Sequence, residues 1–436
     1  MAKKVIRFEP GGRHAAWKKD NIREIPHPEP ERDMPDPVEH PALKPQKSGV
    51  RVSKSVYKII AVLLAAALLL VVLENREELT PGNITNWIRT KAVGFGFGDG
   101  YPTDLTGSTA DPGSFGSIDG NAYVVSDTAL TVMNGSAKEL FSVRHSYNNP
   151  AVSVAGGRYL LYNAGGTGYR INTASGTEIE TAAECDITAA AVSESGKFAL
   201  ALQPADYAAE LCVYMKNGTL QYSYKFADTY ISAIALNRDG TRGAVASVTS
   251  KSGELVSRIT VLDFSEEEPL AVYECSGNLI LGLMWSATNR VIAVGDMQTL
   301  VSNAQFEFDA YDYEGRTVTA FGMEGSRMAV SVSNYAFGGD STLLVFENNA
   351  KPQEIDLPGR AEWISVLGST AAVLLPESVV SVDLSLGKLE ASCDITADTK
   401  CVAMADEGSV YLLGVREIRK ENLKIIRNVE ELFQNN

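Results

Sequence analysis

Apolar residues follow two contrasting patterns along this chain. From Val56 to Leu73 they form a run of eighteen residues that only Lys58 interrupts with a charge. As a helix this run would be about 27 Å long, which is close to the hydrocarbon thickness of a bilayer. From about residue 117 onward, short β-branched and small apolar runs alternate instead with polar turns. The first pattern predicts a transmembrane helix, and the second predicts an all-β domain.

Two other interpretations compete with a membrane span for the apolar run. A buried core helix would carry polar residues on one face, whereas this segment is apolar all round. A cleaved signal peptide would be shorter and would be followed by small residues, but the acidic residues 74–78 follow directly. We therefore predict an uncleaved signal-anchor helix at residues 55–73, with Lys58 reaching back to the membrane interface.

Charges on the two sides of the span predict its orientation. Arg51, Lys54 and Lys58 lie at its N-terminal side, and positive flanks stay in the cytoplasm. We therefore predict a single-pass plasma-membrane protein with a cytoplasmic N-terminus and an extracytoplasmic C-terminal domain. Residues 1–58 carry 13 Lys/Arg against 8 Asp/Glu, a net charge of +5, so the rest of the chain carries 26 against 46, a net charge of −20. The basic end favours anionic lipid as a partner, and the acidic domain excludes nucleic acid.

The segments that flank the span have the composition of connectors. Residues 1–54 hold eight of the seventeen prolines without apolar periodicity, which predicts a disordered, basic, Pro-rich cytoplasmic tail. That tail is either a solvated linker or a ligand for an SH3-like groove. Residues 74–116 form a predicted stalk, with a short helix at residues 80–88 and a glycine-rich connector at residues 94–100.

Residues 117–436 contain a repeated unit, in which an apolar hairpin precedes a more polar strand and a second turn. Polar turns such as residues 155–157, 194–196 and 238–240 separate the strands. Successive units begin about 35–50 residues apart, which is the spacing of four-stranded propeller blades. The apolar hairpins lie at residues 117–126, 151–163, 187–202, 231–247, 280–295, 328–346, 364–375 and 400–413. We predict an extracytoplasmic β-propeller of seven or eight four-stranded blades and favour eight; a stacked array of β-sandwiches is the competing fold.

Five cysteines occur, all of them in the predicted β domain. Cys185, Cys275 and Cys393 recur at the end of an outer strand, which supports the repeat. None of the five forms a CxxC pair, so no zinc-ribbon or thioredoxin-like site is indicated. We expect most thiols to be buried as small apolar groups. Separation alone makes Cys393 and Cys401 the pair best spaced for a disulfide, and the sequence leaves that pairing open.

Motifs for catalysis or cofactor binding are scarce. His145 is the single histidine beyond the tail, so no catalytic triad is indicated and a structural role is expected. Asp309, Asp312 and Glu314 lie near a turn with a spacing that fits no calcium loop, which favours a solvated hairpin. The glycine-rich residues 94–100 lack the flanking strand and helix of a nucleotide-binding loop. We therefore predict no catalytic, metal-binding or cofactor-binding residue.

Several segments resemble known families. Residues 172–177 and 383–388 resemble the outer hairpin of quinoprotein-like propellers, but that family's closing tryptophan is missing, and so are the Gly-His and Trp-Asp marks of WD40 repeats. Residues 125–132, 138–142 and 162–170, together with the tail and anchor, resemble an uncharacterised family of bacterial single-pass membrane proteins of the Gram-positive type. That resemblance implies a propeller-like extracytoplasmic domain and carries no known activity.

These observations lead to one principal functional hypothesis and two rivals. The principal hypothesis is a membrane-anchored binding or scaffolding module at the cell envelope, with a protein or an envelope polymer as its partner and no catalysis. The first rival is a polysaccharide hydrolase or lyase with carboxylates at the propeller mouth. The second is a sensor that signals through the tail. A broad face rimmed by aromatic side chains would favour the binder, and buried acid pairs in a central pocket would favour the enzyme.

Overall fold

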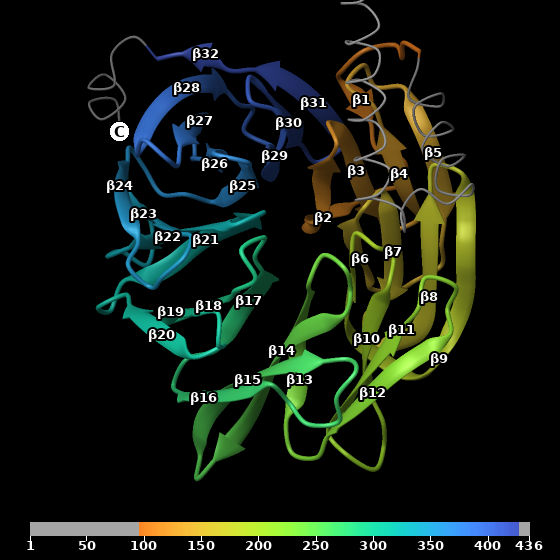
Figure 1. Ribbon diagram of the computed structural model, residues 1–436. Helices are drawn as coiled ribbons and strands as arrows, with labels where there is room; N and C mark the ends of the chain where they lie inside the picture. The colour runs from red at the N-terminus through yellow and green to blue at the C-terminus, as the bar shows by residue number, and fades with distance from the viewer. Residues whose placement is uncertain (1–95, 427–436) are drawn as a thin grey trace, which may run out of the picture. The chain divides into compact units, whose positions relative to one another are not determined.

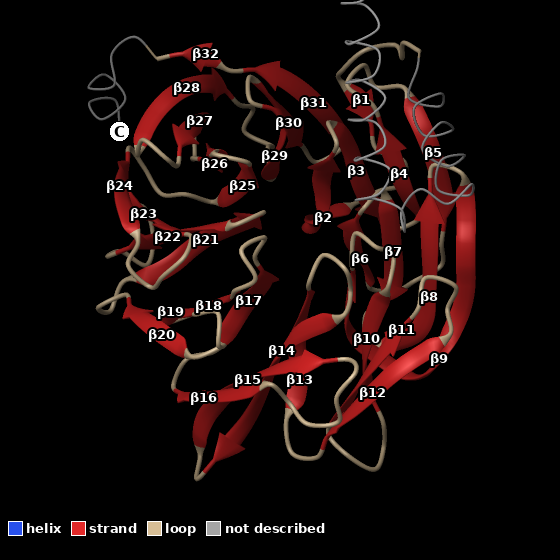
Figure 2. Cartoon of the chain, viewed as in Figure 1, coloured by secondary structure: helices blue, strands red, loops and turns tan. Residues whose placement is uncertain are grey.

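The computed structural model describes residues 96–426, and the regular structure in that range consists of β-strands (Figure 2). Among these residues, no helix is long and apolar enough to cross a membrane. The predicted tail, the span from Val56 to Leu73 and the helix at residues 80–88 lie outside the described residues, and they stay predictions.

The strands form antiparallel sheets that stand around a central axis in chain order (Figure 1). The described residues contain seven sheets, five of which have four strands. The first comprises β2 (Ala110–Ile118), β3 (Asn121–Ser126), β4 (Ala129–Met133) and β5 (Glu139–Arg144).

Four later sheets repeat this up-and-down order. One comprises β13 (Tyr230–Leu236), β14 (Arg242–Lys251), β15 (Glu254–Asp263) and β16 (Ala271–Ser276). The next comprises β17 (Ile280–Trp285), β18 (Val291–Gly295), β19 (Gln298–Ser302) and β20 (Phe308–Asp312). It is followed by β21 (Thr317–Glu324), β22 (Arg327–Ser333), β23 (Ser341–Phe346) and β24 (Gln353–Leu357). The fourth comprises β25 (Trp363–Leu367), β26 (Thr370–Leu374), β27 (Ser378–Asp383) and β28 (Lys388–Asp394), with β32 (Lys424–Ile425) added at its edge.

One sheet has seven strands because a single long strand, β9, pairs with one group of strands in its first half and with another group in its second half. Its members are β6 (Pro150–Ala155), β7 (Arg158–Asn163), β8 (Gly166–Thr173), β9 (Gly176–Val192), β10 (Phe198–Gln203), β11 (Ala209–Tyr214) and β12 (Leu220–Phe226). The first half of β9 pairs mainly with β8, where Thr173 lies opposite Gly176 and Gly168 opposite Ala182. Its second half pairs with β10, where Val192 lies opposite Phe198.

Burial follows the position of a strand within its sheet. The first strands of neighbouring sheets contact one another, as β13 contacts β17 and β25 contacts β29 (Cys401–Asp406). Strands in the middle of a sheet, such as β4, β18 and β26, are buried at every residue, because other sheets cover both of their faces. Final strands such as β5 and β12 expose alternate residues to water. The apolar inner hairpins and wetter outer strands of the predicted repeat are therefore confirmed, except at residues 328–346, which form the second and third strands β22 and β23 instead of the first two.

The strands also define two rims of the ring. The upper rim consists of the loops that precede the first strand of a set and the loops that join its second and third strands. The lower rim consists of the loops that join the first to the second strand and the third to the fourth. The turns predicted at residues 155–157, 194–196 and 238–240 all lie on the lower rim.

The two ends of the described chain close the ring. The last sheet combines β29, β30 (Ser409–Leu413) and β31 (Glu417–Asn422) with β1 (Thr103–Asp104) from the other end. β2 packs against β29, and the Tyr411 hydroxyl donates to the Gly120 carbonyl oxygen at 2.8 Å. Phe115 and Tyr411 share one buried cluster. A stacked array of sandwiches has no such closure, so that alternative is wrong.

Two details differ from the sequence analysis. β1 precedes residue 117, at which the first repeated unit was placed, and β2 begins before that residue. The disulfide considered between Cys393 and Cys401 is absent, since all five cysteines are free thiols. Cys401 packs in the cluster that faces β2, while Cys393 packs in a different cluster with residues of β26 and β30. The expectation of buried thiols is confirmed for Cys212, Cys275, Cys393 and Cys401.

Candidate functional site

Four consecutive first strands carry a β-bulge close to the upper rim. In each of these strands one extra residue has no pairing partner on the second strand of the sheet. These unpaired residues are Thr188, Ser232, Leu281 and Thr319. Three are hydroxyl residues that donate to a carbonyl oxygen of the second strand, as Ser232 Oγ does to Ala246 at 3.3 Å. Leu281 is the exception, and its side chain is 43% exposed. Bulges redirect side chains at functional edges, and here one redirects an apolar group into water.

Further large apolar side chains are exposed on the upper rim of three of these four sheets, those that begin with β13, β17 and β21. Tyr230 begins β13, Met297 lies in the turn between β18 and β19, and Tyr335 and Phe337 lie in the loop between β22 and β23. Phe337 is 94% exposed and Tyr335 is 60% exposed. We call Tyr230, Leu281, Met297, Tyr335 and Phe337 the upper-rim apolar surface.

Hydrogen bonds fix the loops that present this surface. The buried Asn278 accepts from the amides of Met297 and Gln298 through Oδ1, at 3.1 Å in both cases, and its Nδ2 donates to the Gln298 carbonyl oxygen at 3.3 Å. Arg360 Nη1 donates to the Tyr335 carbonyl oxygen at 2.7 Å. These apolar side chains are therefore held out in water by an ordered backbone.

A cleft of about 530 Å³ adjoins Tyr230 on the upper rim. It lies between the loop at residues 204–208 and the loop at residues 227–229, and its lining includes Asp206 and Asp228. The Tyr207 ring packs under the Lys225 ammonium group, which is 4.9 Å from the ring centroid. Asp228 already forms an ion pair with Arg258 at 3.1 Å. Aromatic groups and the acidic Asp206 thus combine at this edge of the surface, which suits a partner with apolar and basic groups.

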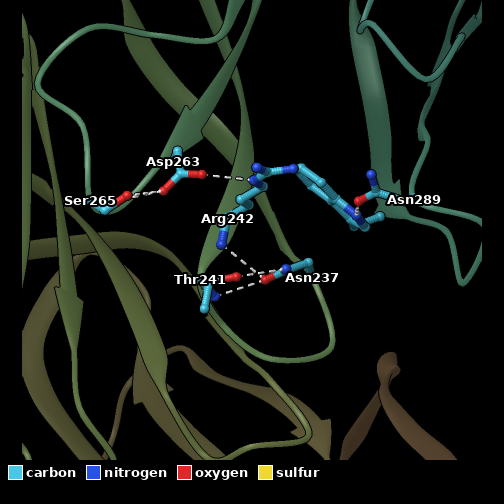
Figure 3. Close-up of polar contacts among 7 residues, drawn as sticks. Asn237, Thr241, Arg242, Asp263, Ser265 and Asn289 are labelled. Carbon is cyan, nitrogen blue, oxygen red and sulfur yellow. Dashed lines mark hydrogen bonds and ion pairs between the residues drawn. The ribbon is translucent and has the colours of Figure 1, made fainter.

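On the lower rim, one cluster of paired polar side chains joins neighbouring turns (Figure 3). Asn237 Oδ1 accepts from the amides of Thr241 and Arg242, at 2.9 Å each, which closes the turn before β14. Arg242 Nε donates to Asp263 Oδ2 at 2.8 Å. In the next sheet, Asn289 Oδ1 accepts from Trp285 Nε1 at 3.1 Å. Hydrogen bonds from Ser265 and from Arg242 lower the pKa of Asp263. These hydrogen bonds stabilise the turn before β14 and the turn after β15. The polar atoms of the cluster are thus used in bonds to one another.

The residues considered for chemistry have structural surroundings. His145 Nε2 lies 3.1 Å from the Ser126 carbonyl oxygen, and its ring stacks on Tyr147. Asp312 Oδ1 accepts from the Glu314 amide at 2.6 Å, so this carboxylate caps its own turn. The described residues contain no group of three or more His, Cys, Asp or Glu side chains placed to hold a metal ion.

Glu324, at the lower end of β21, is an exposed residue whose carboxyl group is partly desolvated by its neighbours. Burial raises its pKa, and the Gly368 amide, which donates to Oε2 at 3.0 Å, opposes that shift. Repulsion from a second carboxylate does not contribute. A glycosidase-like acid pair would show such repulsion, because one carboxyl group would perturb the other.

Residues 102–353 match a family of unknown function, DUF5711, over more than half of the chain. The chain belongs to this family. The matched region includes the whole upper-rim apolar surface. No curated protein matches the sequence. The expected membership of a family without known activity is thus confirmed, while its membrane anchor stays a prediction.

Many solved structures resemble this fold. Sqt1 of Saccharomyces cerevisiae aligns at 10% identity over 74% of this chain and 98% of its own, with a TM-score of 0.54. The β-propeller domain of Cps50 (Swd1) from Myceliophteria thermophila aligns at 9% identity over 74% of this chain and 98% of its own, with a TM-score of 0.49. BamB from Moraxella catarrhalis aligns at 10% identity over 73% of this chain and 100% of its own, with a TM-score of 0.46. Together with the radial sheets, the likeness to Sqt1 shows a β-propeller fold and nothing about activity.

Proposed function

We propose that this protein is a membrane-anchored, extracytoplasmic β-propeller that binds a protein partner through the upper-rim apolar surface. The observation that carries the proposal is the exposure of Tyr230, Tyr335 and Phe337 on one rim. Aromatic residues are enriched among the side chains that dominate binding energy, because they bury a large area with few rotatable bonds. In the loops of the lower rim the exposed large apolar groups are aliphatic or methionine, Leu386 for example, although the 96% exposed Phe97 lies beside the β4–β5 turn of that rim.

The charge of the domain narrows the kind of partner. Chain residues after position 58 carry a net charge of −20, and Asp206 and Asp228 line the cleft beside Tyr230. A partner segment with basic and apolar side chains would match both the negative charge of the domain and its exposed aromatic groups. Electrostatic attraction would speed the encounter, and burial of the aromatic groups would slow dissociation.

The rival enzymatic function lacks a comparable observation. Glu324 is a single carboxyl group whose pKa shift arises from burial. A rim with exposed aromatic side chains is what we expected of the binder, and an acid pair in a central pocket is what we expected of the enzyme.

We further propose eight blades. The first half of β9 completes the set of β6, β7 and β8, and its second half begins the set of β10, β11 and β12. Divided in this way, the seven-stranded sheet supplies two blades and the other six sheets supply one each. The membrane anchor rests on the apolar run from Val56 to Leu73 and the basic residues before it.

A binding experiment with full-length protein in detergent-solubilised membranes tests the function. The double substitution Tyr335→Ser and Phe337→Ser removes the two most exposed aromatic groups of the upper-rim surface, and Leu386→Ser removes an apolar group of the lower rim that is 64% exposed. We expect the double variant to lose at least about tenfold in recovery of cross-linked partners, since each hot-spot residue contributes about 1–2 kcal/mol or more. Leu386→Ser should match the wild type. Equal recovery by all three proteins contradicts the proposal.

A further inference from the structure

Four exposed apolar side chains lie at equivalent turns of the lower rim, those that join a third strand to a fourth. Met215 lies between β11 and β12, Leu270 between β15 and β16, and Leu386 between β27 and β28. Phe97 lies beside the turn between β4 and β5. Single exposed apolar groups are common on soluble proteins, whereas a set at equivalent turns of one rim can meet a flat apolar partner together.

An ordered backbone displays Phe97. The amide of Gly98 donates to Ser136 Oγ at 3.1 Å, and the amide of Gly100 donates to the Ser136 carbonyl oxygen at 3.2 Å. A Cβ atom on Gly98 would lie 2.3 Å from the backbone nitrogen of Lys138, so the close approach requires glycine. This part of the glycine-rich connector therefore docks on the ring and leaves the Phe97 ring in water.

The chain also enters the ring at its lower rim. Leu105 follows β1 and donates to the Arg416 carbonyl oxygen at 2.9 Å, in an upper-rim turn between β30 and β31. β1 therefore runs toward the upper rim, and the residues before it lie at the lower rim beside the β4–β5 turn.

This entry point determines which rim a membrane anchor would hold near the bilayer. The predicted span ends at Leu73, and 22 residues separate it from Gly96. A flexible segment of that length has an r.m.s. length of about 25 Å, so the anchor would hold the lower rim close to the membrane. Contact with the bilayer would then be intramolecular, and weak contacts suffice at the high effective concentration that a short linker produces.

From these observations we propose that the lower rim rests on the extracytoplasmic surface of the lipid bilayer. Phe97, Met215, Leu270 and Leu386 insert at the boundary between headgroups and acyl chains, where aromatic and aliphatic side chains are stabilised. The exposed glutamates at residues 266–268 lie beside Leu270, so burial of apolar groups, and not attraction between charges, drives the contact.

This inference rests on the membrane anchor of the proposed function. It adds an orientation to that function, because the upper-rim apolar surface then points away from the bilayer. The protein partner would approach from the far side of the domain.

Fluorescence quenching in full-length protein, reconstituted into phosphatidylcholine vesicles, tests the lipid contact. Phe97→Trp and Leu386→Trp each place an indole at an exposed position of the lower rim, and Phe337→Trp places one on the upper rim as the matched control. Lipids brominated on their acyl chains quench indoles that touch them. After subtraction of the wild-type signal, brominated vesicles should reduce the fluorescence of both lower-rim indoles at least about twofold and leave the control unchanged. Quenching should persist in about 0.5 M NaCl, since salt screens charges and not apolar contacts.

Three results would overturn the lipid contact. The first is equal quenching of Phe97→Trp and Phe337→Trp, and the second is loss of lower-rim quenching at high salt. The third is loss of cross-linked proteins on Leu386→Ser, which would assign the lower rim to a protein partner instead.

Carbonate extraction of membranes that contain the wild-type protein tests the anchor separately. Release of the protein would overturn the anchor and the lipid contact together. Retained protein with unquenched lower-rim indoles would overturn the lipid contact alone and leave the proposed function intact.

Discussion

At the scale of single residues, one buried amide shapes much of the upper rim. Asn278 is fully buried, and its side-chain amide forms three hydrogen bonds with the backbone of Met297 and Gln298, as a neighbouring strand would. Gly295 leaves room for it, because a Cβ atom there would lie 2.0 Å from Asn278 Oδ1. Such a residue stabilises the fold and positions a surface at the same time.

The substitution Asn278→Ala should lower the free energy of unfolding by about 2–3 kcal/mol, since three buried hydrogen bonds contribute about 1 kcal/mol each. Urea denaturation measures the change. Gln305→Ala, at an exposed position on the lower rim, is the control and should stay within about 0.5 kcal/mol of the wild type. Equal unfolding midpoints for the two variants would show that Asn278 does not hold the turn.

Thiol chemistry gives a second test at this scale. Burial, with nearby carboxylates, raises the pKa of Cys212 to about 12 and that of Cys393 to about 11. Thiolates are the reactive form, so these groups should resist alkylation in the native protein at pH 8. Cys185, which is half-buried, should react first. Mass spectrometry after iodoacetamide treatment should find at most one rapid modification in the native state and five in urea; rapid native labelling of Cys393 would refute the packing.

At the scale of elements, the sequence predicted the hairpins better than their connections. The pairs of apolar strands were evident because β-branched runs and polar turns alternate there. β2 begins before residue 117, and its sequence contains Pro112 and Gly113, which hide a strand pattern. Cys185 matched Cys275 and Cys393 at the end of an outer strand, yet β9 runs on past Cys185. No change of hydrophobic period marks this continuation, because both halves of β9 alternate in the same way.

The site was less predictable than the fold, for a physical reason. Leu281 and Met297 have the residue types of a strand core, and only the bulge in β17 and the turn held by Asn278 bring them into water. Bulges arise from the fit between neighbouring sheets, which a single sequence period does not encode. The one available signal was the aromatic and glycine-rich character of the loop with Tyr335 and Phe337.

Two proline substitutions test the division of β9. Ala190 pairs with Leu200 in the second half of the strand. Ala190→Pro removes a backbone N–H from the sheet and should lower the free energy of unfolding by about 3 kcal/mol or more. Glu184 lies between the two paired halves and is exposed, so Glu184→Pro should cost less than about 1 kcal/mol. Thermal and urea unfolding of both variants measure the difference. Equal costs would mean that the strand does not divide there.

At the scale of the whole molecule, closure joins segments nearly three hundred residues apart. Ser117 Oγ donates to the Met404 carbonyl oxygen, and β1 pairs with β31. The first and last sheets therefore cover each other's apolar faces, and neither is complete without the other.

Deletion of residues 400–436 should therefore expose β3. We expect amide protection at residues 122–125 to fall sharply in the truncated chain, although those residues are unchanged. Hydrogen exchange followed by mass spectrometry measures this protection. Retained protection at residues 122–125 would show that closure does not stabilise the first sheet.

Anchoring is tested at the same scale. Leu69→Arg places a charge near the centre of the predicted span, at a cost of about 2.5–3.5 kcal/mol, and should reduce membrane insertion. A reporter that works only outside the cytoplasm should be active when fused after Asn436. Unchanged insertion, or activity of a cytoplasm-only reporter at that position, would refute the predicted span or its orientation.

The pairing of β1 with β31 also governs when folding finishes. Thr103 lies opposite Ile418, so the strand that leaves the ribosome early must wait for one that follows 315 residues later. At typical synthesis rates this delay is roughly 15–60 s. During that time the ring stays open, and its first blade lacks its final neighbour. A chain exported while it is being made would thus stay without a closed ring, and able to pass through a translocation channel, until its last strands have crossed the membrane. The ring would close only after translocation.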